Sequence, residues 1–179
     1  MLQRPWTRLG LISVAGHLAY ELCSGVGVPL ASRVGITAAT AGFAVPAVLA
    51  YRAAGRLPRP RGNRRFAVAN GLFASAVLAH FTSWPRTTHA GLPWLTECEG
   101  LEGRLMGPYN ALLHLSAVAA VGGAIENRGA WRWFAVTPLR RETLPEYQRL
   151  LAQAAERPRW WNRRLAARTG RAVDGVTAS

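Results

Sequence analysis

The sequence predicts an all-α integral membrane protein, built as a bundle of four transmembrane helices with both termini in the cytoplasm (N-in/C-in) and a basic amphipathic cytoplasmic tail. Three observations lead to this fold class. Four segments are apolar over lengths close to the ~20 residues that cross a bilayer. The arginine-rich segments would all lie on one side of the membrane after four crossings. The mean hydropathy of +0.05 averages these apolar segments with a polar C-terminal part.

The four predicted spans cover residues 9–30, 36–54, 66–84 and 106–125. Arg4 and Arg8 precede the first span, as in a signal peptide. The apolar run is longer than a signal core, however, and has no clear cleavage site of small residues, so we expect a retained first helix. Residues 1–126 then form the transmembrane domain, and residues 127–179 form the tail.

The basic charge follows the predicted topology. The formal net charge is +13, and all 22 basic residues are arginines. They concentrate ahead of the first span, between the second and third spans, and in the tail. Such clustering between apolar spans fits the positive-inside rule better than a nucleic-acid footprint, so we expect no nucleic-acid partner. The expected location is a bacterial plasma membrane, which the chain crosses several times.

The tail contains a predicted amphipathic helix. Pro145 suits an early helical position, and Leu150, Leu151 and Ala154 recur at helical spacing. The arginine- and tryptophan-rich run 157–164 suits an anionic membrane surface.

The first span carries a polar stripe. At 100° per residue its polar side chains fall within an arc of roughly 100°. His17 and Glu21 are i,i+4 neighbours and can touch. A carboxyl inside an apolar span predicts function, and the alternative is a buried structural pair with His17. The stripe consists of Ser13, His17, Tyr20, Glu21 and Ser24.

A second polar group surrounds the start of the fourth span. If the helix begins near Glu99, then Glu99, Glu102, Asn110 and His114 share an arc of roughly 120°. Glu97 and Glu102 can equally be solvated loop carboxylates. The third span adds Asn70 and His80, which, like His114, are alternatively explained as interhelical hydrogen bonds.

We expect one pocket in the outer half of the bilayer to collect several of these groups. Cys23 and Cys98 fall on the same side and are either a disulfide or two unrelated thiols. The predicted pocket residues are Glu21, His80, Glu99, Asn110 and His114.

Buried carboxyls favour acid–base chemistry on an apolar substrate. A protonated carboxylic acid in an apolar cavity can act as a general acid toward an alkene or epoxide of an isoprenoid. A second carboxylate or an aromatic face would stabilise the carbocation. The sequence has no Asp-rich metal pair, P-loop, dinucleotide turn or nucleophile elbow. We therefore expect neither a cofactor nor a metal.

The predicted catalytic residues are Glu21, Glu99 and His17. The predicted substrate-binding residues are Tyr20, Trp94, Glu102, Tyr109, Asn110, His114 and His80.

Two short motifs resemble a known family. The stretch Gly16-His17-Leu18-Ala19-Tyr20-Glu21 resembles the His-x-x-x-Glu motif of the sterol isomerase (emopamil-binding, or EXPERA) family. Glu99 followed by Gly107-Pro108 is similar to that family's second acidic motif. The resemblance implies that His17, Glu21 and Glu99 transfer protons to and from a sterol ring. In that family the two motifs lie on consecutive helices, whereas here two predicted spans separate them.

The chain is also similar in size and character to small membrane-bound terpene cyclases, which are helical, metal-independent and use buried acids. Both resemblances imply a hydrophobic isoprenoid or lipid-like substrate, and they leave cyclisation and double-bond isomerisation open.

Two other functions fit the same residues. In a proton-coupled transporter, the intramembrane Glu and His would be relay groups. Four spans without an inverted repeat would then require a homo-oligomer. In an accessory subunit of a membrane complex, the polar stripes would be subunit contacts and the basic tail would bind lipid or partner proteins.

Overall fold

The computed structural model describes residues 3–26, 28 and 30–139, and it is mostly helical. The predicted tail helix and the arginine–tryptophan run lie outside these residues. The helices in chain order are α1 (Pro5–Cys23), α2 (Ala31–Val34), α3 (Ile36–Arg56), α4 (Asn63–Ser83), the 3₁₀ helix η1 (Gly103–Leu105), α5 (Met106–Glu126), the 3₁₀ helix η2 (Arg128–Ala130) and α6 (Trp131–Leu139).

Three of the described helices are long and apolar enough to span a membrane. They are Ile36–Arg56, Asn63–Ser83 and Gly103–Glu126, and they confirm the second, third and fourth predicted segments as long apolar helices. The helix of the first segment, α1, is not among them. Its 19 residues include Arg8, His17 and Glu21. The predicted bounds 9–30 are wrong for this helix, which begins at Pro5 and ends at Cys23.

A glycine-based cap ends α1. Gly25 has a φ of +84°, which glycine adopts at little cost. Its N–H donates to the Leu22 carbonyl at 3.2 Å, and the Val26 N–H donates to the Glu21 carbonyl at 2.8 Å. This pair of bonds is the Schellman arrangement, which satisfies the last carbonyls of a helix. Glu21 therefore lies in the last turn of α1.

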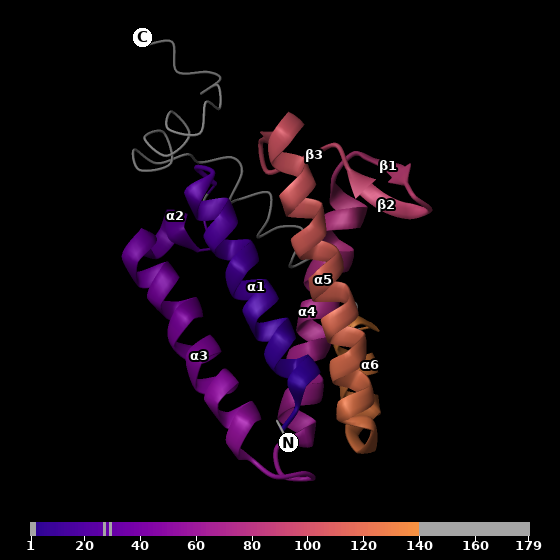
Figure 1. The fold of residues 1–179 in the computed structure, drawn as a ribbon. Helices are drawn as coiled ribbons and strands as arrows, with labels where there is room; N and C mark the ends of the chain where they lie inside the picture. Colours follow the sequence, from indigo (N-terminus) through magenta and orange to yellow (C-terminus); the bar gives the residue numbers. More distant parts are fainter. Residues whose placement is uncertain (1–2, 27, 29, 140–179) are drawn as a thin grey trace.

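Two small β-hairpins fill the connection between α4 and α5 (Figure 1). Strand β1 (Arg86–His89) pairs antiparallel with β2 (Leu92–Leu95), and β3 (Glu97–Cys98) pairs antiparallel with β4 (Leu101–Glu102). The two central residues of each turn have positive φ, as type I′ turns require. The predicted helix from Glu99 is therefore wrong, because Glu99 has a φ of +51° in a hairpin turn and α5 begins only at Met106.

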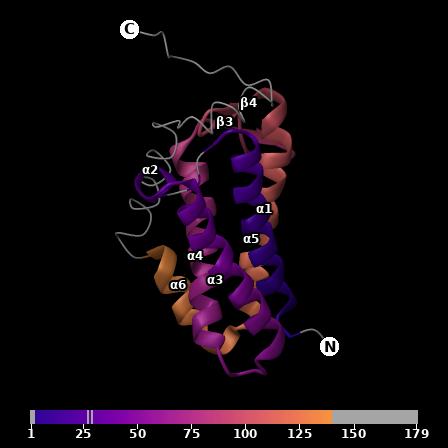
Figure 2. The ribbon, with the colours of Figure 1, turned by 90° about the vertical axis from the view of Figure 1, so that its left-hand side faces the viewer.

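The core of the bundle is α1, α4 and α5, and α3 lies outside it (Figures 1 and 2). Helix α5 packs along both α1 and α4, whereas α3 packs mainly on α1 and buries only Ala39 and Ala54. We call the end of the bundle with β1–β4 the hairpin end, and the end with the start of α1 the N-terminal end.

Glycines allow the core helices to approach closely. A Cβ added at Gly10 of α1 would lie 3.3 Å from the Phe73 ring of α4, and one at Gly123 of α5 would overlap the buried amide of Asn70. Small residues at helix contacts are typical of membrane bundles, since they bring backbones together.

A carboxylate on α5 caps the N-terminus of α1. Glu126 Oε1 accepts a bond from the Trp6 N–H at 2.6 Å, and Oε2 accepts one from the Thr7 N–H at 2.9 Å. Arg4, the residue before the helix, supplies no side-chain cap. The first N–H groups of a helix lack intrahelical partners and carry its partial positive charge. Glu126 therefore fixes the position of α1 against α5.

Arg4 ties the same end to the loop between α3 and α4. Its guanidinium is fully buried, and burial lowers its pKa. It donates to the Leu57 carbonyl at 2.5 Å, to Asn63 Oδ1 at 2.7 Å and to Asn127 Oδ1 at 3.2 Å. It also donates to the Arg61 carbonyl at 2.6 Å. Because all four acceptors are held at once, the N-terminal end fixes the axial position of α1.

Close packing at Gly123 predicts a stability effect. The variant Gly123→Ala should lower the free energy of unfolding by ~1–3 kcal/mol, since the added methyl displaces a buried amide. Thermal unfolding in detergent, followed by circular dichroism, measures the change. Gly107→Ala is the matched control on the same helix, because a Cβ there meets nothing within 4 Å. Equal unfolding temperatures for the two variants would contradict the packing described.

Candidate functional site

A buried polar cluster lies within the apolar core at the hairpin end. Its members come from α1, α4, α5 and the second hairpin, and each is nearly inaccessible to solvent. The surrounding core includes Val77, Phe81, Leu95 and Leu101, so the hairpins close this end of the bundle over the cluster. We call it the hairpin-end cluster; it consists of His17, Glu21, His80, Cys98, Glu99 and Tyr109.

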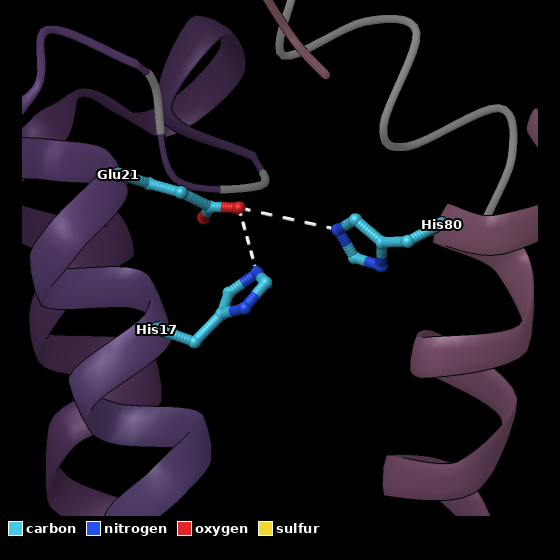
Figure 3. Close-up of side chains that lie close together, drawn as sticks. All are labelled: His17, Glu21 and His80. Atoms are coloured by element: carbon cyan, nitrogen blue, oxygen red, sulfur yellow. Dashed lines mark ion pairs between the residues drawn. The ribbon is translucent and has the colours of Figure 1, made fainter. Parts of the chain in front are cut away.

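Glu21 is the centre of the cluster. Its side chain is 3% exposed, and Oε1 lies 2.7 Å from His17 Nε2 and 4.0 Å from His80 Nε2 (Figure 3). The Tyr109 hydroxyl donates a hydrogen bond to the same oxygen at 2.9 Å. Helices α1, α4 and α5 therefore converge on one carboxylate oxygen.

The local sequence explains the pair on α1. His17 and Glu21 are one helical turn apart, so their side chains meet on one face. The predicted polar stripe faces the bundle interior, where Ser13, His17 and Glu21 are buried. The predicted contact between His17 and Glu21 is therefore confirmed.

The hydrogen bond on the far side of the His80 ring fixes its tautomer. Nδ1 lies 2.6 Å from the Ala76 carbonyl, which can only accept, so Nδ1 carries the proton. In the neutral ring, Nε2 then carries a lone pair. Nε2 makes no hydrogen bond within the described part of the chain, and it points toward Glu21 (Figure 3). His80 thus offers a base to the carboxyl on the neighbouring helix.

Cys98 and Tyr109 extend the cluster toward the hairpins. The Cys98 sulfur lies 3.4 Å from the Tyr109 hydroxyl. Burial, with the nearby Glu99 carboxylate, raises the pKa of the Cys98 thiol, so it stays protonated and unreactive. Cys23 is exposed and Cys98 is buried, and both are free thiols. Of the two alternatives left open by the sequence, the structure has the unrelated thiols.

Glu99 reaches the cluster from a turn rather than from a helix. It is 3% exposed, and its carboxylate, the Cys98 sulfur and a His80 ring nitrogen all lie within 4.8 Å of one another. Both carboxyls predicted as catalytic therefore approach His80. Glu21 and Glu99 are far apart in the sequence. They come close in space because the second hairpin packs against α4 and α5.

Other predicted site residues have structural partners. Asn110 accepts from the Leu95 N–H at 2.8 Å and donates to the Leu95 carbonyl at 2.9 Å, so its amide attaches β2 to α5. Trp94 stacks on His114 with ring centroids 6.1 Å apart. Tyr20 donates to the Leu105 carbonyl at 2.9 Å. Glu102 is exposed on β4.

The main groups that sequence reasoning missed are Cys98 as a cluster member and the polar contacts of Arg4, Thr7, Glu126 and Asn127 at the opposite end. The sequence signal for Glu126 was a carboxyl at the end of an apolar span. Nothing in the sequence indicated that its partner would be the start of α1.

Comparison of the chain with protein-family models, with curated proteins and with solved structures gives no match. The resemblance to sterol isomerases therefore stays a prediction, and the chemistry of the site rests on its own geometry.

The two cysteines should differ sharply in reactivity. In the folded protein, a maleimide should label Cys23 and leave Cys98 unmodified even when the pH is raised, because the Cys98 thiol is buried and its pKa is raised. Mass spectrometry should find one label per folded chain and two after denaturation without reductant. The variant Cys23→Ser should remove labelling of the folded chain. No label after denaturation would indicate a disulfide and contradict the structure.

Proposed function

We propose that the protein is an intramembrane acid–base enzyme that protonates an alkene or epoxide of an isoprenoid substrate, with Glu21 as the proton donor. The single observation that carries this proposal is the approach of His17, His80 and Tyr109 to one buried oxygen of Glu21. A carboxyl held this way in an apolar core has a fixed orientation and an environment that excludes water.

The proposal includes a membrane topology. Helix α1 would be a fourth span, since it packs along two helices that are long and apolar enough to cross a bilayer. At a rise of 1.5 Å per residue, its 19 residues extend for about 28 Å, close to the thickness of the hydrocarbon core. The N-terminal end carries Arg4, Arg59 and Arg128, which supports a cytoplasmic location for it in a bacterial plasma membrane. The hairpin-end cluster then lies in the outer half of the bilayer.

The proposed acid, Glu21, and the proposed base, His80, lie 4.0 Å apart, which suits a reaction that both adds and removes a proton. His17 Nε2 and Glu21 Oε1 lie 2.7 Å apart, so a proton between them would be in reach of both atoms. Transfer of a proton from Glu21 to an alkene carbon breaks the π bond and leaves a carbocation. His80 Nε2, which carries a lone pair, removes a proton from a neighbouring carbon and forms a new double bond. The proton returns to Glu21 across the 4.0 Å gap, so the substrate changes its bonding and not its formula.

Aromatic rings are placed to stabilise the cation. Tyr109 is buried against His17 with ring centroids 4.8 Å apart, and Tyr20 lies 6.3 Å from Tyr109. The face of an aromatic ring attracts a cation. Glu99, buried beside His80, would supply a second stabilising carboxylate. Because the hairpins close the end of the bundle, a lipid-like substrate would enter sideways between the helices.

The functional test is conversion of isoprenoids by membranes that contain the protein. Wild type is incubated with prenylated and epoxidised isoprenoids, and products are separated by retention time and mass. We expect a product with the mass of its substrate. Glu21→Gln, which keeps the size and acceptor oxygen but removes the acid, should lower the rate by at least about 100-fold. Glu99→Gln should also lower it.

Glu97→Gln is the matched control, because Glu97 is an exposed carboxyl on the same hairpin as Glu99. It should leave the rate unchanged. If wild type converts nothing, or if folded Glu21→Gln is as active as wild type, the acid-catalysis proposal fails. The transporter and accessory-subunit functions would then take precedence.

A further inference from the structure

We propose that His17 Nε2, a carboxylate oxygen of Glu21 and His80 Nε2 form a binding site for one divalent transition-metal ion, with Zn²⁺ as the best fit. The proposal goes beyond the proposed function, because it concerns which cation these atoms bind and needs no substrate.

The three donor atoms are close enough for one ion. They all lie within 4.8 Å of one another, and each side chain is buried. Zinc is usually tetrahedral, so bonds of about 2.0–2.1 Å place two of its ligand atoms about 3.4 Å apart. The separation between His80 Nε2 and Glu21 Oε1, 4.0 Å, is longer than this, and that between His17 Nε2 and Glu21 Oε1 is shorter. Small rotations of the His17 and Glu21 side chains, now 2.7 Å apart, would admit the ion.

His80 is prepared as a ligand by its backbone contact. Metal-binding histidines usually donate the other ring N–H to a carbonyl or carboxylate, which fixes the tautomer and orients the ring. The bond of His80 Nδ1 to the Ala76 carbonyl, at 2.6 Å, does this. It directs the lone pair of a buried Nε2, which has no hydrogen-bond partner within the described residues, toward Glu21 (Figure 3).

The types of donor select the metal. Imidazole nitrogens favour zinc and its neighbours over magnesium and calcium, which prefer oxygen ligands. Two histidines and one carboxylate are a ligand set of catalytic zinc sites, in which a fourth position stays open. Tyr109, whose hydroxyl lies 2.9 Å from Glu21 Oε1 and 3.4 Å from His17 Nε2, would be next to that position.

Metal and proton would compete for the same atoms. Zn²⁺ would displace a proton between His17 and Glu21, and one proton would leave the site per ion bound. A bound ion would therefore block proton donation by Glu21. Metal binding and proton donation by Glu21 would therefore exclude each other.

The test is zinc binding to the purified full chain, prepared in detergent without a polyhistidine tag and stripped with a chelator. After incubation with ZnCl₂ and gel filtration, the metal content is measured by mass spectrometry. Wild type should hold one zinc per chain. Glu21→Gln and His80→Ala should each lower the affinity at least about tenfold, as judged by competition with a chromophoric chelator.

His114→Ala is the matched control. His114 also lies 2.8 Å from a backbone carbonyl through Nδ1, but it is not one of the three donors. The His114→Ala variant should bind zinc with the same affinity as wild type. Helical circular dichroism and a monodisperse elution profile identify variants that fold. If His80→Ala does not fold, the zinc affinity of Glu21→Gln alone tests the assignment of the ligands.

Co²⁺ gives a second readout of the ligands. Wild type should show a visible absorption band that Glu21→Gln lacks, whereas Cys98→Ser should keep it. Loss of metal in Cys98→Ser with retention in Glu21→Gln would overturn the assignment, as would a folded wild type that binds no zinc. Neither result depends on isoprenoid conversion, so failure of the metal site and failure of the enzyme function are distinguishable.

Discussion

The packing of α1 against α5 is the constraint on which the rest of the structure depends. A helix with a carboxyl in its last turn cannot be buried unless that carboxyl has partners, because an unpaired buried charge is costly. Tyr109 and His17 provide partners for Glu21 at the hairpin end. At the N-terminal end, Glu126 provides partners for the first N–H groups of α1. Both ends of the helix are therefore fixed by polar contacts to its neighbours.

This arrangement explains why the hairpin end can hold a carboxyl in an apolar core. The serines between the two ends, Ser13, Ser75 and Ser116, each donate to a carbonyl of their own helix. They need no partner across the bundle, so the middle of α1 packs closely. Glu21, in contrast, has its partners on neighbouring helices as well as on its own, and a proton and a metal ion would compete for its carboxylate oxygen. Under the two proposals, a bound metal ion would prevent Glu21 from donating a proton.

Much of the helical framework could be predicted from the sequence, because it depends on local patterns. Mean hydropathy over a window fixes α3, α4 and α5, and the helical period places His17 and Glu21 on one buried face. The end of α1 was predicted too late, although Gly25 carries the signal of a helix C-terminus.

The features that could not be predicted from the sequence depend on turns and on contacts between segments distant in the chain. The pairs Ala90-Gly91 and Glu99-Gly100 form tight turns, but a glutamate with positive φ is rare, and the helical period misplaced Glu99. The capping of α1 by Glu126 joins residues far apart in the chain, so no local pattern reveals it.

Tyr109 holds Glu21 across the interface of α1 and α5. A double-mutant cycle tests it most directly, with unfolding free energies in detergent measured for Glu21→Leu, Tyr109→Phe and the double variant. If the two side chains interact as described, their effects are coupled by at least about 0.5 kcal/mol. If the effects add to within about 0.3 kcal/mol, the two groups do not interact, and the cluster at the hairpin end is not as described.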